Sequence, residues 1–111
     1  MSTAKTEYGN VTVLTVKEEL SGEAVEAFGD LATQCIDQEK HNIVVDCSAV
    51  TTMDSAALEM LLDLQDKCED KCGAVKLCGL DRICAKILEI TRLARRFEAF
   101  GDLESAVKSF V

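Results

Sequence analysis

The chain contains no proline, a single histidine and no apolar run that approaches the ~20 residues needed to cross a bilayer. Without proline, linkers or repeats, nothing in the 111 residues marks a domain boundary. The N-terminal segment 1–7 lacks the apolar stretch of a secretory signal. The composition is 48% hydrophobic, which excludes a disordered chain. We therefore expect one cytoplasmic domain over residues 1–111, large enough to form a core without metals or disulfides.

Positive charge is also scarce. The chain has 12 lysines and arginines against 20 aspartates and glutamates, which gives a formal net charge of -8. Nucleic acids and anionic membranes require a cationic protein surface, so neither is expected as a partner. An acidic surface favours solubility and is compatible with a basic protein partner.

The six cysteines lack the spacing of a zinc site, because no Cys-x-x-Cys pair occurs and His41 is far from a second ligand cluster. A protein without a secretory signal resides where thiols stay reduced, which argues against a disulfide framework. Each cysteine instead occupies a position where an apolar residue would serve, so we predict buried core residues and no metal or cofactor. One alternative stays open: Cys68 and Cys72, at i and i+4, could bind a soft metal if two further ligands were supplied. The cysteines are Cys35, Cys47, Cys68, Cys72, Cys78 and Cys84.

Hydrophobic periodicity predicts alternating strands and helices. Gly9-Asn10 is a two-residue hairpin signal. Ser21, Asp81 and Asp102 are predicted N-caps, and Gly73 is predicted to end the second helix. The fold class is α/β: a mixed, mostly parallel sheet of four or five strands flanked by about four helices. The predicted strands are 5–8, 11–16, 42–46, 74–78 and a short edge strand 97–100; the helices are 23–38, 55–71, 82–91 and 103–110.

No catalytic constellation is visible, and we predict that the protein is not an enzyme. There is no glycine-rich phosphate loop and no His-Glu-x-x-His motif. Asp46 ends a predicted buried strand, the position of the acceptor aspartate in phosphate-receiver domains. Glu18 and Glu19 could supply the acidic pair that such a domain needs. The competing prediction is that Asp46 caps the following loop, 47–52, with its side chain.

The junction between strand 42–46 and helix 55–71 is the most informative segment. It places Asp54 and Ser55 at a helix start, where unpaired N–H groups and the positive dipole end suit a hydroxyl, a carboxylate or a phosphate. Two hypotheses follow for Ser55. It is an N-cap or a first-turn residue, or it is a regulatory phosphoserine.

Three stretches of the chain resemble the STAS domain, a family named for sulfate transporters and anti-sigma factor antagonists. They are 43–55, with its Asp-x-Ser-x-Val loop and Met-Asp-Ser junction, then 73–80, and the C-terminal half from Ile83 to Val107. The chain differs from the family pattern after Ser55, where Ala56 and Ala57 replace a Ser or Thr and a Gly. It differs again in the preceding loop, where Glu18 and Ser21 replace a Gly and an Asp.

The resemblance implies an anti-sigma factor antagonist that binds an anti-sigma factor serine kinase and is switched off by phosphorylation of Ser55. It also implies that the Ser21 loop lies beside the phosphosite and contributes to partner binding. The alternative is a STAS scaffold or ligand-binding subunit of a transport or signalling complex, never phosphorylated. For either role we expect a monomer or a weak dimer. The predicted partner-binding residues are Thr52, Met53, Asp54, Ser55, Ala56, Leu58 and Ser21.

Overall fold

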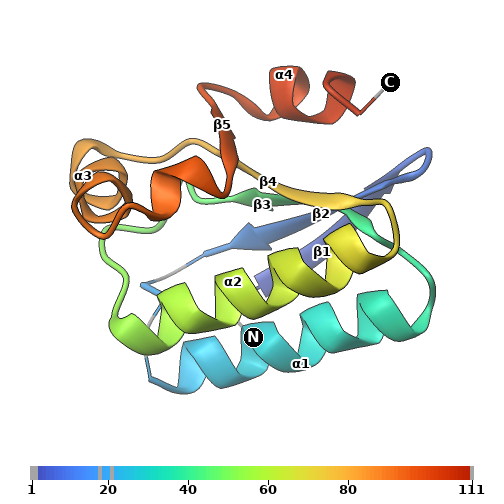
Figure 1. Cartoon of the computed structure of the whole chain (residues 1–111), viewed down its shortest axis with the longest axis horizontal. Helices are drawn as coiled ribbons and strands as arrows, with labels where there is room; N and C mark the ends of the chain where they lie inside the picture. The colour runs from blue at the N-terminus through green and yellow to red at the C-terminus, as the bar shows by residue number, and fades with distance from the viewer. Residues whose placement is uncertain (1–2, 18, 21, 111) are drawn as a thin grey trace.

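A computed structural model describes residues 3–17, 19–20 and 22–110 of the chain. Five strands form one sheet in the order β1-β2-β3-β4-β5, with β1 antiparallel to β2 and the other pairs parallel (Figure 1). The predicted α/β class and mixed sheet are confirmed. The elements are β1 (Thr3–Tyr8), β2 (Val11–Val16), α1 (Glu23–Asp37), β3 (Asn42–Asp46), α2 (Ser55–Asp70), β4 (Ala74–Cys78), α3 (Arg82–Ile90), the 3-10 helix η1 (Leu93–Arg95), β5 (Glu98–Phe100) and α4 (Leu103–Lys108).

The two faces of the sheet are covered by different helices. In Figure 1, α1 and α2 lie side by side under one face and α4 lies over the other. The main core forms between the sheet and the α1–α2 layer, around side chains such as Phe28, Leu61 and Leu77. A smaller cluster packs under α4, where Ala106 meets Val13 and neighbouring residues of the sheet. Because both faces are covered, the central strands β2, β3 and β4 are almost wholly buried.

Local sequence signals account for most element ends. Gly9-Asn10 forms the predicted hairpin turn, with Gly9 at φ 62° and Tyr8 paired with Val11. The Asp81 carboxylate accepts the Cys84 N–H at 2.7 Å, and Asp102 accepts the Ser105 N–H at 2.8 Å. Both are therefore the predicted N-caps.

Two helix ends differ from prediction. The N-cap position of α1 is Gly22 rather than Ser21, which lies outside the described residues. At the end of α2, Cys72 adopts the left-handed conformation, at φ 64°, before the chain reaches Gly73. Gly73 is required for a different reason: a Cβ there would collide with the carbonyl oxygen of His41. The glycine permits close approach of the two chain segments that enter β3 and β4.

The cysteine prediction is confirmed at five positions and wrong at Cys72, which is exposed. Helical periodicity placed Cys72 on the buried side of α2, but the helix ends at Asp70, and Cys72 lies beyond it in the left-handed conformation. Cys68 is buried, so these two side chains do not share a face. All six thiols are free, and across residues 3–17, 19–20 and 22–110 no group of three or more His, Cys, Asp or Glu side chains is placed to bind a metal.

None of the described helices is both long enough and apolar enough to traverse a membrane.

Candidate functional site

The candidate site forms where the loops after β2 and β3 run side by side. Parallel strands end at the same edge of a sheet, so the chain leaving β2 meets the chain leaving β3. Leu20 and Met53 form an isolated parallel bridge between the two loops. The hydroxyl of Thr51 donates a hydrogen bond to the carboxylate of Glu19 at 3.2 Å.

Asp54 is the central residue of this junction. One oxygen, Oδ1, accepts the N–H of Ala57 at 2.9 Å and caps α2. The other oxygen, Oδ2, faces the N–H of Gly22 at 3.4 Å, at the start of α1. A single carboxylate thus stabilises the first turn of α2 and ties it to the beginning of α1.

Ser55 is the first residue of α2, and its side chain is exposed. Because Asp54 makes the capping bond, Ser55 is a first-turn residue and not the N-cap. The N–H groups of a first helical turn have no partner within the helix, so this position faces solvent with the positive end of the helix dipole.

The predicted partner-binding residues divide by exposure. Asp54, Ser55 and Ala56 are exposed, and Thr52 is half-buried. Met53 and Leu58 are 5% and 9% exposed and belong to the main core, where they support the exposed residues from beneath. Ser21 lies outside the described residues.

Asp46 has the predicted capping role. Its Oδ1 accepts the N–H of Ser48 at 3.1 Å and the hydroxyl of Ser48 at 2.6 Å, which closes the turn that leaves β3. The receiver alternative is wrong for this chain. A receiver sheet reverses its strand order at the site, whereas this sheet runs in sequence order from an antiparallel hairpin.

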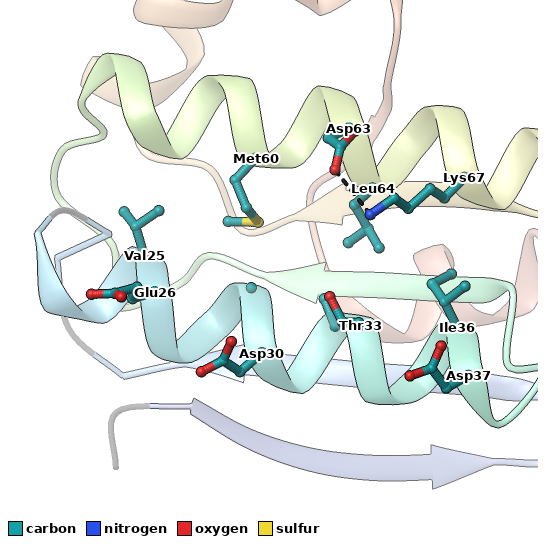
Figure 2. A pocket seen from close by; sticks show the side chains of 12 residues that line it. Val25, Glu26, Asp30, Thr33, Ile36, Asp37, Met60, Asp63, Leu64 and Lys67 are labelled. Atoms are coloured by element: carbon teal, nitrogen blue, oxygen red, sulfur yellow. Dashed lines mark ion pairs between the residues drawn. The ribbon is translucent and has the colours of Figure 1, made fainter.

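A second surface feature, missed by the sequence analysis, is a groove of about 430 Å³ between the solvent-facing sides of α1 and α2. Figure 2 shows Val25 on α1 and Met60 on α2 among the apolar side chains that line it. Carboxylates of both helices, including Asp30 and Asp63, stand at its rims. Acidic residues at helical spacing, Glu59, Asp63 and Asp66, were visible in the sequence of α2, but the pairing of the two helices depends on tertiary packing.

Comparison with known proteins places the fold in a family. The STAS domain model matches residues 2–106. The chain belongs to the STAS domain family. No curated protein matches the sequence.

Solved structures share this STAS fold at low sequence identity. A candidate anti-sigma factor antagonist from Thermotoga maritima is 18% identical, with a TM-score of 0.91 over 96% of this chain and 92% of that one. The anti-sigma factor antagonist SpoIIAA of Bacillus, in its unphosphorylated form, is 18% identical, with a TM-score of 0.84 over 97% and 95%. The murine anion transporter Slc26a9 is 19% identical, with a TM-score of 0.76 over 92% of this chain and 18% of that one.

Proposed function

We propose that this chain is a single STAS domain that acts as an anti-sigma factor antagonist. In this proposal it binds an anti-sigma factor serine kinase through the exposed Asp54–Ala56 segment. Phosphorylation of Ser55 by that kinase ends the complex. The chain itself carries no catalytic role.

The observation that carries the proposal is that Asp54 and Ser55, which are adjacent in the chain, have separate roles. Asp54 makes the contacts that hold the junction together, to Ala57 and Gly22. Ser55 is exposed beside it and is not the residue that caps the helix. A modification of Ser55 therefore need not disturb the bonds that build the site.

A phosphate on Ser55 is compatible with the fold. It adds roughly −1.5 to −2 charges at pH 7, and a helix N-terminus interacts favourably with negative charge. The same phosphate stands next to the Asp54 carboxylate, one turn before Glu59 on α2. A partner that accommodates this acidic edge would have to desolvate a further charge, which weakens binding without unfolding the domain.

Ala56 and Ala57, the two positions after Ser55 where the chain differs from the family pattern, differ in exposure. Ala57 is fully buried, so its methyl group faces the core and not a partner. Ala56 is exposed, and it is the position where the altered side chain would meet a kinase. The match of this chain to 18% of the Slc26a9 transporter chain supports a second candidate function, that of a STAS scaffold without phosphorylation.

Phosphorylation is tested by incubating the protein with ATP and each GHKL-type serine kinase from its genome, and then measuring intact mass. We expect one kinase to add a single phosphate to the wild type and none to Ser55→Ala. The matched control is Ser105→Ala, which removes an exposed serine from the first turn of α4 on the opposite face of the sheet. Labelling that persists in Ser55→Ala would reject Ser55 as the acceptor. Kinase binding without any phosphate transfer would favour the scaffold function.

A further inference from the structure

The charge of this protein is concentrated on one layer. Helices α1 and α2 together contain nine carboxylates and one lysine, while the rest of the chain contains 11 acidic and 11 basic residues. The two helices therefore carry the whole formal net charge of -8. The groove between them is an apolar floor with acidic rims.

Few positively charged side chains neutralise the carboxylates at the rims of the groove. Lys67 pairs with Asp63 at 3.1 Å, as Figure 2 shows. Among the described residues, no lysine or arginine forms a salt bridge with the rim carboxylates Glu26, Asp30 and Asp37. An occupant that brings cations and apolar side chains together would satisfy both parts of the groove.

Helix α3 presents the opposite combination. At 100° per residue, Ile83, Lys86, Ile87 and Ile90 fall on one side of α3, and we call this set the α3 ridge. Ile83 and Ile90 are 58% and 69% exposed, two of only three large hydrophobic side chains that the described residues expose. The segment 82–96 around the ridge contains five cations and one acid, Glu89, which lies 3.7 Å from Lys86. Arg96 already pairs with Asp66 and Glu69 of α2 in the same molecule, which leaves four cations near the ridge.

We propose that the α3 ridge of one molecule docks in the α1–α2 groove of a second copy of this chain. The two surfaces match in chemistry, since an apolar ridge with cations would meet an apolar floor with carboxylates. They also match in length. At 1.5 Å per residue, the nine residues of α3 span about 13 Å, and the groove from Val25 to Asp37 spans about 18 Å of α1.

The geometry makes the association head-to-tail. In Figure 1, α3 lies at one end of the sheet, apart from the α1–α2 layer, so a molecule cannot fill its own groove. Each copy would use its ridge on one neighbour and its groove on another. Such a contact leads to open chains or rings and not to a closed two-fold dimer. The contact of one short helix is small, so the association should be weak and reversible.

The test is sedimentation velocity of wild type from about 10 μM to about 1 mM, the range of weak protein contacts. The mean mass of the wild type should rise above the 12.1 kDa monomer with concentration. Ile83→Asn disables the ridge and Asp30→Lys disables the groove. Each variant alone should associate at least about tenfold more weakly than wild type. The matched controls are Tyr8→Asn, another exposed apolar residue, and Asp70→Lys, an exposed α2 carboxylate outside the groove. Both should associate like wild type.

Mixing the two disabled variants gives the decisive result. The Asp30→Lys protein retains its ridge and the Ile83→Asn protein retains its groove, so an equimolar mixture should form a heterodimer and stop there. A wild type that remains at 12.1 kDa throughout, or a mixture that stays monomeric, would overturn the proposal. The proposal would also be overturned if the wild type is monomeric and Asp30→Lys abolishes kinase binding. The groove would then be the surface that binds the kinase. Ser55→Ala should leave the association unchanged, so this result is independent of the phosphorylation test.

Discussion

The carboxylate of Asp54 lies 3.4 Å from the backbone N–H of Gly22, a residue 32 positions earlier in the chain. The same side chain caps α2 through Ala57. The start of α1 and the start of α2 are therefore held together by one exposed acidic residue. This carboxylate adds to the Leu20–Met53 bridge and the Thr51–Glu19 hydrogen bond, which also join the two loops.

Replacing Asp54 tests this arrangement. We expect Asp54→Ala to lower the free energy of unfolding by about 1–2 kcal/mol, because it removes the N-cap of α2 and the acceptor beside Gly22. Asp54→Asn should lose less, since its amide oxygen can still cap the helix. Urea denaturation measures both. Asp70→Ala, at the other end of the same helix, is the control, and an equal loss there would contradict a specific role for Asp54.

Substitutions at Ser55 should separate stability from binding. Ser55→Asp and Ser55→Glu should change the unfolding free energy by only about 0.3–1 kcal/mol, in the stabilising direction, because the new charge meets the helix dipole. Ser55→Ala should stay within about 0.5 kcal/mol of wild type, since Asp54 and not Ser55 is the cap. The acidic variants should bind the kinase more weakly, as calorimetry would show, while Ser55→Ala should bind like wild type. Acidic variants that bind as tightly as wild type would place Ser55 outside the interface.

The thiols should react in two distinct groups. Cys72 is exposed, whereas the other five cysteines are buried. Burial raises the pKa of Cys68 to about 12 and that of Cys84 to about 11, so these thiols are protonated and unreactive at neutral pH. Titration of the native protein with Ellman's reagent should detect one thiol per chain, and all six after denaturation. Cys72→Ser should abolish the native reaction and leave five reactive thiols after denaturation. More than one rapidly reacting thiol in the native protein would contradict the buried core.

Lys76 should control the attachment of α4. It is a buried lysine whose Nζ donates hydrogen bonds to the hydroxyl of Ser109 at 2.9 Å and its carbonyl at 3.2 Å. The same ammonium group lies 4.2 Å from the ring centroid of Phe110. Lys76→Met keeps an apolar stem but removes these contacts, and we expect a loss of about 1–2 kcal/mol. Hydrogen exchange should accelerate first in 103–108. Lys108→Met, an exposed lysine of the same helix, should show neither effect.

Much of the architecture could be predicted from local sequence. Strand and helix order follows from hydrophobic periodicity, because each period matches one backbone geometry. Asp81, Asp102 and Asp46 were assigned correctly because each bonds to a backbone N–H only two or three residues away. The family resemblance likewise rests on residues near one another in sequence, and the match over 2–106 confirms it.

Other features were decided by tertiary structure. The exposure of Cys72 depends on where α2 ends, and the approach of Gly73 to His41 depends on how the chain enters two paired strands. The contact between Asp54 and Gly22 joins loops that meet only because β2 and β3 are adjacent and parallel. The groove exists because α1 and α2 pack side by side on one face. The sequence determined the elements and their local caps, since those bonds span a few residues. Folding decided the loop junction and the groove, since each is made by segments that are distant in the chain.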